Sequence, residues 1–362
     1  MGASPTDPVA ALASDVSYAR ILVRLPTWVG DVVMATPALR ALARRWPEAA
    51  IVCEGRPHLE ELVLGLPGVR EFLPDPGRRA RDLPRRVRGL RSGQFELAVI
   101  LPDSHRSALG PWLARIPQRV GYARDLGRRL MLSQWLPIPL ENGRRQPASM
   151  IQQFLGLSRA LGCPDDGETM QVPIGPETRS SVQARLAAVG IEAGQPYLVA
   201  VPGASYGSSK RWPAASFAAA AEGLHAQRGW PLVMAPGPGE EAIAHEVAGA
   251  MGTPVHVFAE PVLGLLQLAA LIEGAALCLS NDTGPRHFAV ALGVPVVVPV
   301  GPMDLRYTAH QLDRQRLVSA GASCSPCGLP TCPIDHHCMR DLTPRRILDA
   351  ATELLAPPGE SP

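Results

Sequence analysis

Residues 275–300 have the sequence AALCLSNDTGPRHFAVALGVPVVVPV. The apolar run AALCLS (275–280) predicts a buried strand, and a second apolar run, VPVVVPV (294–300), predicts another. Between them a polar turn leads into a helix expected at 285–292, with Pro285 suited to its first position. A strand, a helix and a second strand in succession predict a parallel βαβ unit, so this stretch indicates an α/β fold.

The same alternation extends through both halves of the 362-residue chain. In the second half, further strands are expected at 197–203, 231–237 and 255–260, and helices near 213–228, 240–251 and 261–274. In the first half, strands are expected at 20–25, 49–55 and 95–101, and helical segments at 36–46, 57–66 and 78–91. Two doubly wound parallel sheets follow from this pattern, and the length suits two domains.

Composition suggests where the domains end. The segment 163–178 is polar and rich in Pro and Gly, with no clear period, which is typical of a linker. We therefore expect the following division: a loose tail at 1–18, a first Rossmann-like domain at 19–165, a linker at 166–178, a second Rossmann-like domain at 179–342, and a C-terminal helix and tail at 343–362.

Several classes of protein are disfavoured. The first 18 residues lack a basic n-region and an apolar core, and no run of 18 apolar residues occurs, so we expect a cytoplasmic protein with reduced thiols. No strand is followed by G-x-G-x-x-G or by a P-loop, and no Ser-centred nucleophile elbow is present, which disfavours dehydrogenases, P-loop phosphotransferases and α/β-hydrolases. We expect no nucleic-acid partner.

The net charge of +2 conceals an asymmetry. Residues 1–159 hold 23 Arg against 14 Asp and Glu, a balance of +9, and the remainder holds 12 basic against 19 acidic residues, a balance of −7. A basic first half suggests that it handles an anionic ligand, although solvated arginines in an Arg-rich chain are the alternative.

Polar residues follow the strand 275–280, at the carboxyl end where open α/β sheets bind ligands. Asp282, Thr283 and Gly284 would stand at the start of the next helix, whose exposed N–H groups and positive dipole end favour a phosphate. The Thr hydroxyl adds a donor, and Gly lets the backbone approach closely. An Asp or Thr that merely caps the helix is the alternative.

Lys210 is the single lysine among the 35 basic residues. It follows the strand 197–203, behind the glycine- and serine-rich turn PGASYGSS. A lysine in that place offers phosphate oxygens a compact point charge that the longer, planar Arg would not reproduce. A chance exposed lysine is the alternative.

Two carboxylates stand at other strand ends. Glu240 or Glu241, in GPGEE (237–241), has the chemistry to accept hydrogen bonds from a ribose, although a first-turn Glu also complements the helix dipole. Asp31, just beyond the first strand, is placed to take a proton from an attacking hydroxyl, with a helix N-cap as the alternative.

Four segments together resemble glycosyltransferase family 9, the heptosyltransferases, over roughly residues 20–355. They are, in chain order, WVGDVVMATPALRALARRWP (28–47), PGASYGSSKRWP (202–213), NDTGPRH (281–287) and the cysteine-bearing CSPCGLPTCPIDHHCMRDLTP (324–344). The resemblance implies an α/β fold of the GT-B type, two Rossmann-like doubly wound parallel-sheet domains facing a cleft. It implies that the first domain binds the acceptor and the second the nucleotide-sugar.

The resemblance also implies an activity: inverting, metal-independent transfer of heptose from ADP-heptose to the lipid A-linked inner core of lipopolysaccharide, with no cofactor. Carried onto this chain, Asp31 matches the general base and Lys210 the group that neutralises the departing diphosphate. Asp282, Thr283, Gly284 and His287 match the donor-binding turn. Ser205 and Glu240 are also expected to bind the donor, with Glu241 as the alternative to Glu240. The residues expected to bind the anionic acceptor are Arg106, Arg119 and Arg128. His287 has a packing histidine as its alternative.

The chain departs from the family pattern in places. Arg286 stands where a small or apolar residue is usual. Ser205, Ser208 and Ser209 stand near the position where a threonine is common. The Arg-rich helical stretch at 78–91 adds the expectation of a peripheral contact with the inner membrane.

The cysteines of the last segment raise the alternative of a zinc site. Cys324, Cys327, Cys332 and Cys338 are close in sequence, with His336 and His337 among them. Their spacing lacks two C-x-x-C pairs, and the chemistry that the resemblance implies needs no metal. Reduced structural thiols are therefore preferred, and no metal is expected.

Three other functions stay open on the sequence. The first is a related transferase with a different nucleotide sugar or glycan acceptor. The second is a non-catalytic GT-B protein that binds a sugar nucleotide, which the presence of both Asp31 and Lys210 disfavours. The third is a dehydrogenase, which would have to bind nicotinamide without the usual glycine-rich turn.

Overall fold

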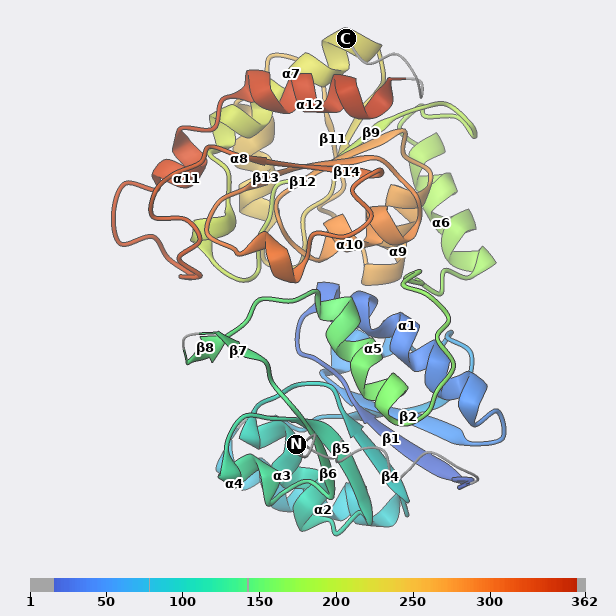
Figure 1. Cartoon of the computed structure of the whole chain (residues 1–362). Coiled ribbons are helices and arrows are strands. Elements are labelled where there is room, and N and C mark those ends of the chain that lie inside the picture. Colours follow the sequence, from blue (N-terminus) through green and yellow to red (C-terminus); the bar gives the residue numbers. More distant parts are fainter. Residues whose placement is uncertain (1–15, 78, 142, 357–362) are drawn as a thin grey trace. The chain divides into compact units, whose positions relative to one another are not determined.

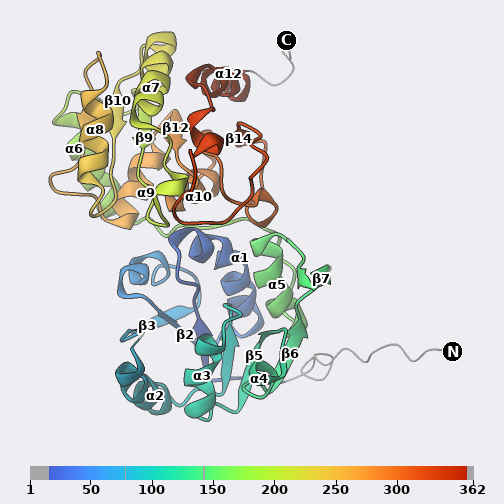
Figure 2. The same cartoon turned by 90° about the vertical axis from the view of Figure 1, so that its left-hand side faces the viewer.

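The computed structural model describes residues 16–77, 79–141 and 143–356. It divides into two compact units, Met1–Pro173 (unit 1) and Ile174–Pro362 (unit 2), drawn in Figures 1 and 2. Of the expected tails, residues 1–15 and 357–362 lie outside the described residues.

Unit 1 is built around a six-stranded parallel sheet in the order β3-β2-β1-β4-β5-β6. Its strands are β1 (Arg20–Arg24), β2 (Ala50–Gly55), β3 (Val69–Pro74), β4 (Leu97–Ile100), β5 (Gln118–Ala123) and β6 (Gln134–Pro137). Its α-helices are α1 (Val29–Arg45), α2 (Leu83–Ser92), α3 (His105–Leu113), α4 (Leu126–Arg129) and α5 (Met150–Ala160). A small antiparallel pair, β7 (Leu140–Glu141) and β8 (Arg144–Arg145), stands apart from the sheet.

Helices cover both faces of this sheet, which is why its central strands are continuous apolar runs. On one face, Leu22 of β1 and Ala98 and Ile100 of β4 pack with Val87 of α2 and Ala108 of α3. Helices α1 and α5 pack against each other on the opposite face (Figure 2).

Unit 2 repeats the architecture with a second six-stranded parallel sheet, in the order β11-β10-β9-β12-β13-β14. Its strands are β9 (Leu198–Val201), β10 (Leu232–Met234), β11 (His256–Val257), β12 (Leu277–Ser280), β13 (Val296–Val300) and β14 (Gln315–Ser319). Its α-helices are α6 (Pro176–Ala187), α7 (Ala214–Arg228), α8 (Glu241–Gly249), α9 (Leu265–Glu273), α10 (Gly284–Ala291), α11 (His337–Arg340) and α12 (Pro344–Leu355).

The core of unit 2 also lies between sheet and helices. Leu198 of β9 and Leu279 of β12 pack with Phe217 of α7, Val247 of α8 and Ile347 of α12. Helices α9 and α10 lie on the other side of the sheet (Figure 1). The stretch 275–300 forms the expected strand, helix and strand, so the prediction of two doubly wound parallel sheets is confirmed.

The structure differs from the sequence-based expectations in the helix expected at 57–66 and in several strands. The helix expected at 57–66 is a 3₁₀ helix, Pro57–Leu62, because Gly65 and Pro67 interrupt any continuation. The short pair β7 and β8 was not expected, nor were four strands of the two large sheets, β3, β5, β6 and β14. Three of them are sheet edges, and all four keep polar or half-exposed residues, so they lack the apolar run that marks a central strand.

No helix within the described ranges combines the length and the apolar character needed to cross a membrane.

Candidate active site

The strand order of unit 2 brings two distant turns together. The chain runs outward from β9 to β10 and β11, then returns to β12 on the other side of β9, so the order reverses between β9 and β12. Open α/β sheets bind ligands at the carboxyl ends of their strands at such a point. The turn after β9 carries Lys210, and the turn after β12 carries Asp282.

The Lys210 side chain reaches from its own turn to the turn after β12. Its Nζ donates to the main-chain oxygen of Asp282 at 2.8 Å and pairs with Asp282 Oδ2 at 3.2 Å. The ammonium also lies 5.3 Å from the centre of the Tyr206 ring, and only 13% of the side chain is exposed. The alternative of a chance exposed lysine is therefore wrong.

Asp282 is a buried carboxylate held between two cations. Its Oδ2 pairs with Lys210, and its Oδ1 accepts a hydrogen bond from Nη1 of Arg286 at 2.5 Å. Burial alone would raise the pKa of this carboxyl, but Arg286 and Lys210 outweigh burial and hold the pKa of Asp282 well below its usual value. Asp282 therefore stays ionised and orders the turn.

Helix α10 begins directly after this turn. Its N-cap residue is Thr283, which has an extended backbone and makes no side-chain capping hydrogen bond. The Thr283 hydroxyl donates instead to the carbonyl of Asn281 at 3.3 Å. Thr283 is thus the N-cap residue by position, as the alternative had it, but its side chain does not cap the N–H groups that begin at Gly284. A helix start in this condition is suited to bind a phosphate.

Glu240 lies at the carboxyl end of the neighbouring strand β10, at the start of α8. Its Oε2 accepts from the N–H of Gly237 at 3.3 Å, and its buried Oε1 has no hydrogen-bond partner among the described residues. Burial raises the pKa of this carboxyl. Glu241, by contrast, accepts locally from the N–H of Gly239 at 3.2 Å. The geometry therefore distinguishes the two glutamates that the sequence left open, and favours Glu240 as a ligand group.

The three serines before Lys210 have different surroundings. Ser209 is buried, and its Oγ donates to the carbonyl of Leu329 at 2.5 Å. Its N–H donates to the carbonyl of Pro330 at 3.1 Å, and its own carbonyl lies 2.7 Å from Nε2 of His336. The Ser209 hydroxyl is thus used inside unit 2, whereas Ser205 is exposed in the turn after β9.

His287 points into the interior of unit 2, where sequence analysis did not foresee its neighbour. Its ring stacks on His310 with 5.4 Å between ring centres and 20° between ring planes. Burial lowers the pKa of His287 well below its usual value, and Arg286 and His310 lower it further. Nδ1 of His287 has no hydrogen-bond partner among the described residues.

The segment that carries the cysteines supports the Lys210 turn through its main chain, as the contacts of Ser209 with Leu329 and Pro330 show. None of the seven cysteines, all of which are described, forms a disulfide. Within the described ranges, no three His, Cys, Asp or Glu side chains are arranged to hold a metal ion.

In unit 1 the strand order reverses between β1 and β4, and Asp31 follows β1. Helix α1 begins at Val29 with Trp28 as its N-cap, so Asp31 is a first-turn residue and not the N-cap that the sequence left open. Its side chain is partly exposed at the carboxyl edge of the sheet.

The three arginines expected to bind the acceptor differ in their surroundings, beginning with Arg106. It is exposed at the start of α3, after β4. Arg119 lies near the amino end of β5, at the opposite edge of the sheet, where its Nε donates to the carbonyl of Met131 at 2.8 Å. Arg128 is 1% exposed and donates to the carbonyls of Pro102 (2.6 Å) and Tyr122 (2.5 Å). The expectation for Arg119 and Arg128 is therefore corrected, because both guanidinium groups hold unit 1 together.

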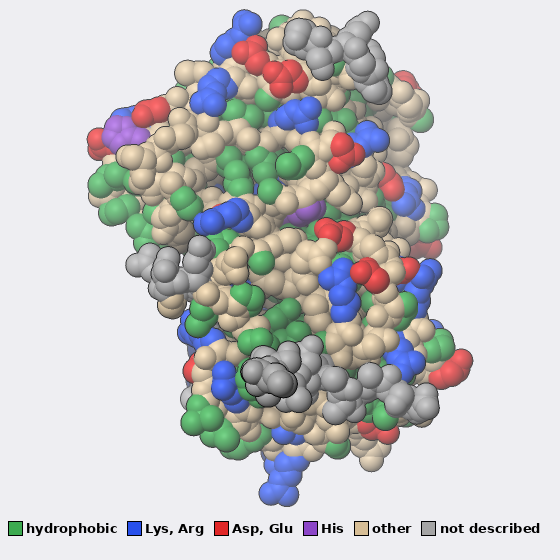
Figure 3. All heavy atoms as spheres, viewed as in Figure 1, with side chains coloured by type: hydrophobic (Ala, Val, Ile, Leu, Met, Phe, Trp, Pro, Cys, Tyr) green, Lys and Arg blue, Asp and Glu red, His purple; other side chains and the backbone are tan. Residues whose placement is uncertain are grey.

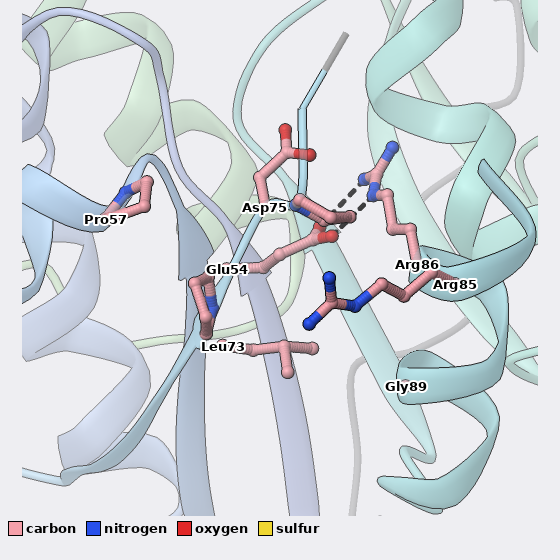
Figure 4. A pocket seen from close by; sticks show the side chains of 9 residues that line it. Glu54, Pro57, Leu73, Asp75, Arg85, Arg86 and Gly89 are labelled. Carbon is pink, nitrogen blue, oxygen red and sulfur yellow. Dashed lines mark hydrogen bonds and ion pairs between the residues drawn. The ribbon is translucent and has the colours of Figure 1, made fainter. Parts of the chain in front are cut away.

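A hollow of about 370 Å³ lies beside the carboxyl ends of β2 and β3 and against α2. Glu54 is held there by Arg86, whose Nη2 donates to Glu54 Oε2 at 2.8 Å. Arg85 extends from α2 into the same hollow (Figure 4) and has no hydrogen bond or ion pair with any described residue. Arg85 belongs to the arginine-rich stretch at 78–91, for which the sequence predicted a peripheral membrane contact.

Comparison with known proteins shows which family this chain resembles over most of its length. The family model of glycosyltransferase family 9 (heptosyltransferase) matches residues 84–337. Lipopolysaccharide heptosyltransferase 2 of Salmonella typhimurium is 27% identical over 361 residues, which cover 94% of this chain and 99% of that protein. Lipopolysaccharide heptosyltransferase 2 of Escherichia coli is 26% identical, with 93% and 98% covered.

Solved structures agree with the sequence relatives. The E. coli ADP-heptose LPS heptosyltransferase II is similar to this chain with a TM-score of 0.72 at 26% identity, covering 93% of this chain and 98% of that one. A glycosyltransferase family 9 structure from Veillonella parvula has a TM-score of 0.80 at 20% identity, covering 95% and 99%, and shows the fold alone. The expected α/β fold of the GT-B class is confirmed. Because the family match spans more than half of the sequence and reaches into both sheets, this chain belongs to glycosyltransferase family 9, the heptosyltransferases, and is a glycosyltransferase.

Proposed function

We propose that this enzyme transfers a heptose from ADP-heptose to the inner core of lipopolysaccharide, with inversion and without a metal ion. The observation that carries the proposal is the cluster in unit 2 where Lys210, Asp282 and the start of α10 come together at a strand-order reversal. The relatives named above act on lipopolysaccharide, and one solved relative is named for ADP-heptose.

The donor nucleotide is assigned to unit 2. The Lys210 ammonium and the N–H groups at the start of α10 provide positive charge and donors for a diphosphate, which supports a departure that needs no cation. The unpartnered Oε1 of Glu240 is an acceptor for ribose hydroxyls. The neutral ring of His287 offers Nδ1 to a donor hydroxyl.

The acceptor is assigned to unit 1. In the proposed reaction the Asp31 carboxylate takes the proton of an acceptor hydroxyl, and that oxygen forms a bond to the anomeric carbon of the heptose. The bond from that carbon to the ADP oxygen breaks, and ADP leaves with the bonding electron pair. One displacement of this kind inverts the anomeric configuration. The exposed Arg106, and Arg85, which has no hydrogen bond or ion pair with a described residue, are suited to phosphates or sugar acids of the acceptor.

Mass spectrometry of reactions with a panel of nucleotide sugars and deep-core acceptor lipids tests the proposal. We expect a heptose-sized mass increase with ADP-heptose, inversion at the anomeric carbon by NMR, and unchanged turnover after treatment with EDTA. Transfer from a different nucleotide sugar would reassign the donor. Retention of configuration would contradict the single displacement, and loss of turnover in EDTA that Mg²⁺ restores would contradict metal independence.

We also propose that the enzyme works at the cytoplasmic face of the inner membrane in peripheral contact with it. Support comes from the acceptor class, which is lipid-linked, and from the arginines of α2 beside the hollow in unit 1.

A further inference from the structure

Arg286 is a fully buried cation beside the turn that carries Asp282. It lies on the first turn of α10 and is 0% exposed. Besides Asp282, its guanidinium donates to the side-chain oxygen of Gln315 at 2.9 Å and to the carbonyl of Thr308 at 2.6 Å. A buried guanidinium is costly unless its donors and its charge are matched, and here both are.

Arg286 changes the charge of the proposed diphosphate site. Lys210 and Asp282 alone would form a neutral pair, because one carboxylate compensates one ammonium. Arg286 takes Oδ1 of the carboxylate at 2.5 Å, and Lys210 shares Oδ2 at the longer distance of 3.2 Å. The cluster of two cations and one carboxylate therefore carries a net charge of +1, and burial keeps the neighbouring His287 neutral.

We propose that Arg286 is a positioning residue for the donor: it holds Asp282 by Oδ1 and so leaves the Lys210 ammonium with the net positive charge that binds a diphosphate. This inference rests on the proposed function, since it takes the ligand to be a nucleoside diphosphate. Arg286 does not touch the ligand and acts through Asp282 and Lys210.

A purely structural role for Arg286 makes a different prediction. If the side chain only tied α10 to Thr308 and Gln315, its loss would weaken every ligand of unit 2 alike. If it acts through the charge of Lys210, the loss in affinity grows with the number of phosphates on the ligand.

Calorimetric titration of adenosine, AMP and ADP into the full chain separates these roles. We expect Arg286→Met to raise the Kd for ADP by about tenfold or more, the Kd for AMP by less, and the Kd for adenosine by less than about twofold. In a Lys210→Met background, Arg286→Met should have little further effect on ADP, because the group through which it acts is gone. The matched control is Arg314→Met, which removes an arginine whose side chain is 56% exposed.

Two further variants keep the test decisive if Arg286→Met does not fold. Arg286→Lys keeps the charge but loses part of the guanidinium's hydrogen bonds, so it should retain more ADP affinity than the neutral Arg286→Gln, which should lose as much as Met. Equal losses for Lys and Gln, or equal losses for adenosine and ADP, would overturn the inference. If Lys210→Met weakens the binding of ADP but neither Arg286→Met nor Arg286→Gln does, this inference alone is wrong. If Lys210→Met itself leaves ADP affinity unchanged, the assignment of the donor site under the proposed function is wrong as well.

Discussion

The stacked imidazoles of His287 and His310 illustrate how single residues in unit 2 respond to burial. Burial and the positive charge of Arg286 together lower the pKa of His310 to about 4. The pKa of His287 lies well below its usual value because of burial and the charge of Arg286. Both rings are therefore neutral at neutral pH, and each retains a nitrogen that accepts a hydrogen bond.

The shift of His310 predicts that unit 2 loses stability in mild acid. The unfolded chain binds a proton at this ring near pH 6.5, and the folded chain binds it only near pH 4. Between these values the unfolded state holds more protons, so the free energy of unfolding falls as the pH is lowered. His310→Phe keeps an aromatic ring that can stack but cannot bind a proton. Between pH 7 and pH 5 its free energy of unfolding should therefore fall by about 2 kcal/mol less than that of the native protein.

Urea unfolding at pH 7 and pH 5 measures this difference. The control is His245→Gln, which changes an exposed histidine on α8 and should follow the native protein. An identical acid loss in His310→Phe and the native protein would show that this ring does not titrate as described.

Asp31 makes a residue-scale prediction for the chemistry. Asp31→Asn keeps the shape of the side chain but cannot accept the acceptor proton, so kcat should fall by about 10²–10⁴-fold. The Kd for ADP should stay unchanged, because Lys210 and α10 belong to unit 2. Glu48→Gln, at an exposed carboxylate just beyond α1, is the matched control. Near-native turnover in Asp31→Asn would remove Asp31 from the role of base.

At the scale of elements, the turns after β9 and β10 approach each other closely. A Cβ added to Gly203, after β9, would lie 1.7 Å from Oε2 of Glu240, at the start of α8. The backbone of Gly203 has no positive φ, so the side chain of Glu240 is what a methyl group there would displace. Glycine at 203 therefore lets the carboxylate of Glu240 reach the strand-order reversal.

Gly203→Ala should move the Glu240 carboxylate without unfolding unit 2. We expect the KM for the nucleotide-sugar to rise by about tenfold, as the loss of one hydrogen bond to a charged group would, with kcat little changed. Glu240→Ala should have the same effect, and the double variant should lose little more. Gly175→Ala is the control, because a Cβ there meets nothing within 4 Å. Additive effects in the double variant would separate Gly203 from Glu240.

At the scale of the whole molecule, the basic excess of the first half is not gathered into one large patch on the face shown in Figure 3, where Lys and Arg side chains alternate with acidic and uncharged surface. A more local feature lies on α2. Pro84, Arg88 and Arg91, on the side of α2 away from the first hollow, line a second hollow of about 420 Å³ together with Leu113 of α3. Trp112, which precedes Leu113, is 42% exposed. Arginines next to apolar side chains and an exposed Trp are suited to contact an anionic bilayer surface.

This surface predicts weak, salt-sensitive binding to anionic vesicles. The native chain should sediment with phosphatidylglycerol vesicles more than with phosphatidylcholine vesicles, and Arg88→Glu should reduce the bound fraction several-fold. Arg345→Glu makes the same charge change on α12 of unit 2, where the Arg side chain is 81% exposed, and should leave binding unchanged. Equal losses in the two variants would point to net charge instead of this surface.

How far the sequence predicted the site differs from residue to residue. Lys210, Asp282 and Thr283 could be found because each follows a central strand, and the apolar runs of β9 and β12 mark where those strands end. Arg119 and Arg128 were misplaced because charge alone does not say which edge of a sheet a side chain faces. His310 was missed because no local pattern marks it, and the arginine-rich stretch at 78–91 did not show that Arg85 lies in a hollow.

The sequence by itself determined the α/β class, the central strands and the turns that bear the candidate chemistry, because apolar runs and turn residues act over a few neighbouring positions. Only the tertiary structure decided that Lys210 meets Asp282 across 72 residues, that Arg286 shares that carboxylate, and that Arg128 is buried. Strand order and burial arise from contacts between segments far apart in the chain, and those contacts set the pKa of a buried group and the partner of each charge.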